Sequence, residues 1–506
     1  MSAELLHHVH PEVRYQRVPL ADCDNALSLW LQAVDSIVDS EAISAAYEKY
    51  FQGPCEGGVC GTSPPAPIPP RHEAPELWSL FDRNQPALDL IDAGIARGRL
   101  QLPEPHGLES FDEICCGGSV TVRTRPALRL QHLRAKALAT EGAFEAACGI
   151  VKQMLRMSDL LLHADGVIIT FLIATTYHAV ALSAALELAV ISDVPVSVLR
   201  DLLLFLGQDL RFRQSYAGCL RTDFCCIGTP GLDRMPDDAT ASAVVDAMIA
   251  TYYQSSPSCD ANGDPDDGRT PPDDRVATRR RRLMQVFEGH PRPLDKRLTI
   301  ELMSDDILRQ LQAIERPWRP RRRRPWVRLS KMWDRIRCRK KSFREMLPYQ
   351  LTPEAFYEFL SIADEVPAIV QESWSRRDSI YAEFLPPTSR KLAMLHRKCL
   401  RRRNPIGDIL RVSLGSSMGQ ENVARSEARA SATRVVVALR LYAREHGRLP
   451  EKLVDLISTG ILAAVPTDPF SGRDLLYNAG EKVVWSVGPY GENRGELGEQ
   501  NLIWRL

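Results

Sequence analysis

The chain has 506 residues, enough for two to four domains, and its hydrophobic content of 44% is that of a globular protein. The formal net charge is zero, so bulk charge selects no class of partner. Twelve dispersed cysteines follow no small-disulfide framework and favour a reducing compartment. The first thirty residues hold no basic run followed by an apolar stretch. We therefore expect a cytoplasmic protein, with peripheral attachment to the inner membrane as an alternative.

Residues 1–254 are predicted to form a helical N-terminal lobe. The corner around Gly142 resembles those of tetratricopeptide-type hairpins, but no 34-residue period follows, so packed helical hairpins are expected and not a repeat array. The fold class is therefore mainly α. Apolar residues at helical spacing predict helices over residues 25–50, 76–97, 128–139, 144–162, 167–191 and 195–210.

One of these helices is apolar enough to raise the question of a membrane. Gly166 to Leu186 is a run of 21 residues without a formal charge, close to the length that crosses a bilayer. A bilayer span would place His178 in hydrocarbon, which is costly. A central helix buried by its neighbours is the favoured interpretation, and a membrane span is the alternative.

Residues 255–276 are predicted to be an acidic, disordered linker, because six aspartates and one arginine lie between Asp260 and Asp274 among prolines and glycines. The segment from Asp260 to Asp264 imitates the start of a calcium loop. However, the sixth and twelfth positions, which need Gly and Glu, are Pro265 and Pro271. No calcium site is therefore expected there.

A second helical region, residues 277–422, contains a basic segment. Residues 318–344 hold thirteen Lys or Arg against a single Asp334, interleaved with tryptophans. Such a segment suits phosphate backbones or an anionic membrane surface, whereas a solvated face paired with the acidic linker is the alternative. The candidate anion-binding residues are Arg321, Arg322, Arg323, Arg324, Arg328, Lys331 and Arg335.

No catalytic, metal-binding or cofactor-binding residue is predicted. Gly415 to Gly419 matches the nucleophile elbow of α/β hydrolases, but no βαβ pattern precedes it, and the histidine that follows, His446, lies on the next helix. We interpret this motif as a joint between helices. The histidines near the N-terminus and the adjacent cysteine pairs lack the ligand spacing of a metal site: His7, His8, His10, Cys115, Cys116, Cys225 and Cys226.

Residues 423–506 are predicted to form a small α+β module. A long helix ends before Gly447, which suits a left-handed C-cap, and the prolines at 466 and 469 restrict a turn. Strands are expected over 475–477, 483–487 and 502–504. One apolar stripe of the helix is expected to cover the sheet face that carries Val483, Trp485 and Val487. The predicted core residues are Leu439, Tyr442, Pro469, Phe470 and Trp485.

This order of elements resembles the globular part of the major pseudopilin of type II secretion systems. There a helix, a Leu-Pro step, a Pro-x-Asp-Pro-Phe/Trp-Gly turn and a Ser-x-Gly-x-x-Gly hairpin follow each other, as they do here between 423 and 491. Pseudopilins begin with a basic leader and an apolar anchor helix, which the preceding 420 residues lack, so a filament subunit is not expected. The calcium-binding aspartates of several pseudopilins have no equivalent in the loop from Gly488 to Gln500.

The wider arrangement looks like large planctomycete-type bacterial proteins that carry such a module and usually also an N-terminal membrane helix. The resemblance implies a fold and an assembly context but no chemistry. We expect a non-enzymatic helical scaffold or adaptor with a protein partner, linked to a secretion or envelope assembly through residues 423–506. The alternative is a peripheral nucleic-acid or anionic-membrane binder that uses residues 318–344.

Overall fold

The computed structural model describes residues 9–15, 17–51, 59–60, 68–103, 120–164, 166–208, 211–228, 296–314, 419–489 and 502–506. Across these ranges the protein is mainly α with a small, largely antiparallel sheet, as the sequence predicts. The predicted acidic linker, the candidate anion-binding residues and the motif from Gly415 to Ser417 lie outside the described residues.

The helices follow one another closely along the N-terminal part. They are η1 (Pro11–Val13), α2 (Leu27–Ser36), α3 (Ser40–Tyr50), α4 (Pro75–Arg83), α5 (Gln85–Ala96), α7 (Val120–Arg123), α8 (Arg125–Thr140), α9 (Phe144–Leu162), α10 (Ile168–Val190), α11 (Val196–Leu206), α12 (Phe212–Asp223) and the π-helix η3 (Phe224–Gly228). Farther along lie α16 (Lys296–Ile314), α22 (Gly419–His446) and α23 (Asp455–Ser458).

Two of the predicted helices are broken. The single helix predicted over 25–50 is interrupted between α2 and α3, where Asp39 has a φ of 58°. The one predicted over 76–97 is interrupted at Asn84. The buried Asn84 side chain accepts a hydrogen bond from the Val38 N–H (2.9 Å) and donates one to the Val38 carbonyl (3.2 Å), so it satisfies the backbone that the first break exposes. The Asn84 side chain therefore joins the two places at which the predicted helices are interrupted.

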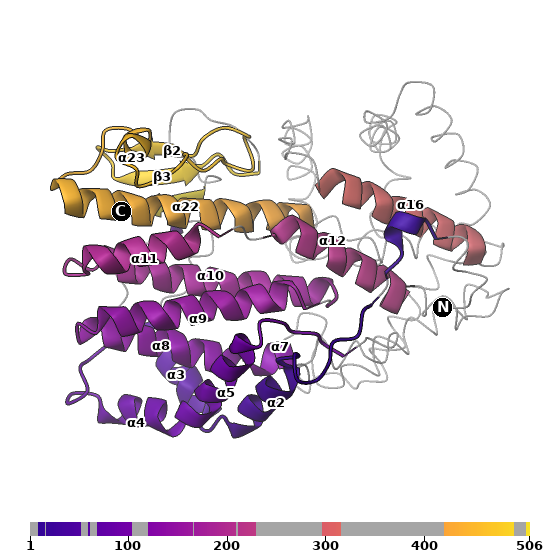
Figure 1. Cartoon of the computed structure of the whole chain (residues 1–506), viewed down its shortest axis with the longest axis horizontal. Helices are drawn as coiled ribbons and strands as arrows, with labels where there is room; N and C mark the ends of the chain where they lie inside the picture. Colours follow the sequence, from indigo (N-terminus) through magenta and orange to yellow (C-terminus); the bar gives the residue numbers. More distant parts are fainter. Residues whose placement is uncertain are drawn as a thin grey trace, which may run out of the picture.

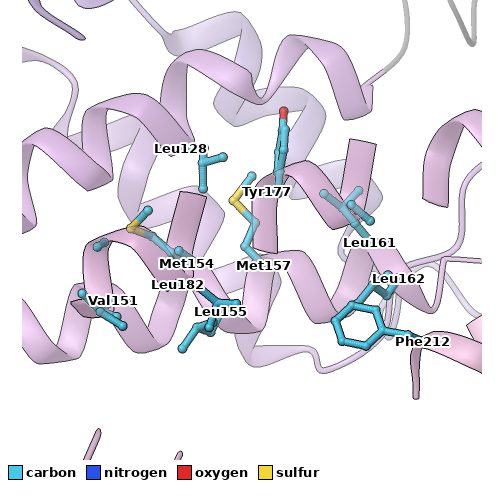
Figure 2. Packing of buried hydrophobic residues seen from close by; sticks show 14 of the residues in the cluster. Leu128, Val151, Met154, Leu155, Met157, Leu161, Leu162, Tyr177, Leu182 and Phe212 are labelled. Atoms are coloured by element: carbon cyan, nitrogen blue, oxygen red, sulfur yellow. The ribbon is translucent and has the colours of Figure 1, made fainter. Parts of the chain in front are cut away.

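The helices stack in layers (Figure 1). α8, α9 and α10 are joined by short connections and pack face to face, with buried side chains such as Met154, Met157, Tyr177 and Leu182 between them (Figure 2). α22 lies across α10 and α11 (Figure 1). Its residues belong to the same continuous apolar core as those of α8 to α12. The helix that opens the predicted module therefore shares its core with the predicted N-terminal lobe.

α10 occupies the centre of this arrangement. Within the described ranges it is the one helix long and apolar enough to cross a membrane, and 56% of its most apolar window is buried. α8, α9, α12 and α22 all pack against it. Tyr177, fully enclosed, donates a hydrogen bond to the Thr121 carbonyl at 2.6 Å. These contacts are those that the buried-helix interpretation requires.

The sheet lies on the side of α22 opposite α10 and α11 (Figure 1). Strands β2 (Leu476–Asn478), β3 (Val483–Ser486) and β4 (Leu502–Arg505) pair antiparallel, and the two-residue β1 (Val59–Cys60) pairs parallel with β4. The order is β1-β4-β3-β2. β1 comes from the N-terminal part of the chain, so the sheet also joins segments far apart in sequence.

The predicted buried face of β3 is correct for Val483 and Val487, which are 3% and 5% exposed, but Trp485 requires correction. Val484 and Trp504 are register partners, and both join the main core with at most 4% of their surface exposed. Trp485 points to the other face, because side chains alternate along a strand, and it is only partly buried. The two valines at 483 and 484 made the choice of face ambiguous from sequence.

Candidate functional site

α22 is buried on more than one side. Five consecutive residues, Val435 to Leu439, are all completely buried. A helix packed along one stripe keeps part of every turn in solvent, so such a run requires partners on opposite faces. The single stripe predicted through Leu439 and Tyr442 therefore describes only part of the helix. The sheet covers one side, and α10, α11 and α12 cover another.

Two ion pairs fasten α22 to the helical lobe. Arg213 of α12 donates to both carboxylate oxygens of Glu427, at 2.7 and 2.9 Å, and this hydrogen bonding raises the pKa of the guanidinium. Arg200 of α11 pairs with Glu445 near the other end. Glu427 and Glu445 are 18 residues apart, which is about five turns at 3.6 residues per turn, so they lie on the same face. The lobe therefore holds this face at both ends.

A buried histidine lies near the first of these attachments. His178 of α10 is 1% exposed, and its ring meets that of Phe212 edge to face at a centroid distance of 5.2 Å. Burial lowers its pKa to about 4, with Asp159 raising it and Arg429 of α22 lowering it. Its Nε2 has no hydrogen-bond partner within the described part of the chain. The packing between α10 and α22 therefore favours the neutral form of the His178 imidazole.

A buried carboxylate fixes the turn of the module to the sheet. Asp468, 1% exposed, accepts hydrogen bonds from the Ser486 hydroxyl (2.8 Å) and the Val487 N–H (3.2 Å) of the strand segment. It also accepts from the Phe470 N–H (3.1 Å) and the Ser471 hydroxyl (3.0 Å) in its own turn. Asp468 belongs to the turn motif noted in the sequence but was given no role there, although Asp followed by Ser and Gly is typical of a side-chain-capped turn.

The predicted core residues of the module have different environments. Leu439 and Phe470 are fully buried, and Tyr442 is 8% exposed and stacks on the His446 ring at 4.1 Å. Pro469 and Trp485 are only partly buried.

Apolar side chains also reach the surface of the module. On and beside α23, Val454 is 55% and Ile457 is 38% exposed. Ile461 and Val465, farther along the same segment, are partly buried. α23 lies above α22 in Figure 1, on the side of the sheet and away from α10 and α11. The Tyr477 hydroxyl donates to the Pro450 carbonyl at 3.0 Å and ties this segment to β2. A rigid, partly apolar surface results.

The N-terminal lobe contains a second polar group of residues. The Tyr47 hydroxyl lies 3.3 Å from His132 Nδ1, and Glu187 Oε1 lies 3.3 Å from His132 Nε2. Burial is the main cause of the raised pKa of Tyr47. The Phe51 ring packs against both aromatic rings. This network links α3, α8 and α10 through packed groups, so its evident role is to hold the three helices together.

Of the histidines and cysteines considered as metal ligands, His10, Cys225 and the buried Cys226 are described. His10 donates its N–H to the Ser304 hydroxyl at 2.8 Å, and the Cys225 thiol lies 3.6 Å from the Val13 carbonyl. In the described ranges no group of three or more His, Cys, Asp or Glu residues could hold a metal ion. His7, His8, Cys115 and Cys116 lie outside these ranges.

No protein-family model, curated protein or solved structure matches the chain. The pseudopilin resemblance of residues 423–506 therefore stays a prediction from the sequence. Any function has to be argued from the residues themselves.

Proposed function

We propose that the protein is a non-enzymatic helical scaffold or adaptor that presents a pseudopilin-like C-terminal module to a protein partner. The observation that supports this proposal is the two-sided burial of α22, from Val435 to Leu439, between the helical lobe and the sheet. A helix of 28 residues is about 42 Å long, so it joins the two parts over a large fraction of the molecule.

The fixed orientation of the module is central to this proposal. Paired charges at Glu427 and Glu445 hold both ends of α22, and Asp468 holds the turn against the strand. A module joined through a flexible linker could bind a partner without fixing the position of that partner relative to the helices. A module on a rigid mount places its partner in a defined position relative to α8 to α12, which is what a scaffold does.

The surface around Val454 and Ile457 is the proposed contact for the partner. Exposed apolar side chains on a rigid frame are typical of interaction surfaces. The resemblance to pseudopilins points to a protein component of a secretion or envelope assembly as the occupant. We place the protein in the cytoplasm, with the inner-membrane surface as the site of assembly.

A capture experiment with the full chain tests this surface. The double variant Val454→Asp, Ile457→Asp should lose a protein partner that the wild type retains from envelope fractions. Leu204→Asp is the matched control, since Leu204 is 72% exposed but lies on α11, on the side of α22 opposite α23 (Figure 1). Equal capture by all three proteins would contradict the proposal.

The alternative is binding of nucleic acid or an anionic membrane through residues 318–344. Thirteen basic residues with interleaved tryptophans favour it, and their displacement of counterions would make binding steeply salt-dependent. Retention on heparin that falls steeply with salt would support this alternative. Envelope-partner binding that is insensitive to salt would support the scaffold.

A further inference from the structure

A small cavity opens in the N-terminal lobe beside the end of α9. Its volume is about 150 Å³, and Leu20, Arg99, Gln101, Asp159, Leu160 and His163 are among the residues that line it. A water occupies about 30 Å³ of liquid volume, so the space corresponds to about five waters. A small ion with part of its hydration shell fits this volume.

One wall of the cavity is held rigid by reciprocal amide bonds. The Gln101 N–H donates to Asn25 Oδ1, and Asn25 Nδ2 donates to the Gln101 carbonyl, both at 2.9 Å. Gln101 Oε1 accepts from the Leu20 N–H at 2.9 Å. Each bond joins segments about 80 residues apart in sequence. The wall is therefore preformed, which removes an ordering cost from any binding event.

Two basic side chains, Arg99 and His163, and one carboxylate, Asp159, line the cavity. His163 lies at the C-terminal end of α9, where a cation is favoured, and its Nδ1 is 2.9 Å from the Asp159 carbonyl and 3.3 Å from Asp159 Oδ1. The hydrogen bond to Asp159 raises the pKa of His163, and Arg211, just before α12, opposes that rise. Arg99, also in the lining, supplies a permanent positive charge.

The hydrogen bond to Asp159 also determines which nitrogen of the His163 ring carries the proton in the neutral form. When Nδ1 carries the proton donated to Asp159, Nε2 is left to bind another group. In the imidazolium form Nε2 becomes a second donor. When His163 is protonated, the lining carries two positive charges, on Arg99 and His163, against the one negative charge of Asp159. Asp159 is also the carboxylate that acts on the buried His178.

We propose that this cavity binds a small oxyanion, of the phosphate or carboxylate class, between Arg99 and His163. A guanidinium matches the paired oxygens of such an anion, and the imidazolium adds a second charge-assisted donor. Affinity increases as the pH falls, because His163 then carries its charge. This site is independent of the module surface around Val454.

Calorimetric titration of the full chain tests the site with three probes. Sulfate keeps the same charge between pH 5.5 and 8, so its affinity reports the protonation of the protein. Phosphate and acetate then decide between a tetrahedral and a planar ligand. Binding of sulfate that weakens as the pH rises is the expected result. No heat from any of the three anions at tens of millimolar would overturn the proposal.

Variants assign the binding to these residues. Arg99→Gln and His163→Gln should each weaken sulfate binding about tenfold at pH 6, the effect of losing one charge-assisted hydrogen bond. His163→Gln should also abolish the pH dependence. His72→Gln is the matched control, because His72 is an exposed histidine 3.5 Å from Glu73 that does not line the cavity. Unchanged affinity in both cavity variants, with unchanged melting temperatures, would overturn the assignment.

Discussion

The Ser486 hydroxyl donates a hydrogen bond of 2.8 Å to the carboxylate of Asp468, and both residues are buried. This bond crosses from the turn to the strand, so it sets the position of the loop that covers the sheet. Because the carboxylate accepts three further hydrogen bonds, its removal leaves several donors without a partner.

Asp468→Ala should therefore lower the free energy of unfolding by about 3–5 kcal/mol. Asp468→Asn keeps one acceptor oxygen and should lose less. Urea denaturation measures both, with the exposed Asp474→Ala in the same turn as the control. A loss no larger than that of Asp474→Ala would contradict the role assigned to Asp468.

The two ion pairs on α22 should differ in strength. Arg213 and Glu427 are partly buried and joined by two hydrogen bonds, whereas the Arg200 side chain is 60% exposed. A double-mutant cycle on Arg213 and Glu427 should give a coupling of about 1–3 kcal/mol, and one on Arg200 and Glu445 at most about 0.5 kcal/mol. The reverse order would show that the contact with α12 does not fasten the helix.

Acid should destabilise the protein through His178. Its pKa is about 4 in the fold against 6.5 as the ordinary value, so the unfolded chain binds more protons between these pH values. Stability is complete above pH 6.5 and is lost as the pH falls toward 4. His178→Leu should remove this part of the pH dependence, as measured by denaturation between pH 4 and 8. Similar slopes in wild type and variant would exclude a buried neutral histidine.

Asp223 should act in the opposite direction. Burial raises its pKa to about 7, although the Ile168 N–H donates to it and lowers the value. The folded chain then binds more protons than the unfolded one, so stability falls as the pH rises from about 4 to 7. Asp223→Asn should gain stability relative to wild type at pH 8 and show little difference at pH 4. Thermal melts at the two pH values decide this.

The sequence predicted elements well where local signals coincide. α9 begins and ends where the apolar pattern places it, at Phe144 and Leu162, and α22 ends before Gly447, whose φ is 69°. The missed features depend on distant partners. Asn84 lies at the second helix interruption and hydrogen-bonds to Val38 at the first, 46 residues away in the sequence. α12 was not predicted, although its buried residues Phe212, Tyr216, Cys219 and Leu220 recur at helical spacing.

The candidate site was predictable only in part. Periodicity revealed one stripe on α22, but the second buried face is apparent only once α10 and α11 are placed beside it. Val483 and Val484 point to opposite faces of β3, so both faces of the strand look apolar in the sequence. The alternation of side chains therefore could not show whether Trp485 or Trp504 is the tryptophan of the core. The cavity beside His163 is formed by segments whose proximity no local pattern records.

Because α22 is buried on both sides, the module and the helical lobe should unfold as one cooperative unit. Native-state hydrogen exchange of the full chain tests it most directly, with the amides of α10 and of β3 followed in wild type and in Glu427→Gln. Both sets of amides should exchange at the same free energy, and the variant should lower that free energy equally for both. Exchange of β3 at a lower free energy, with α10 unaffected by the variant, would contradict it.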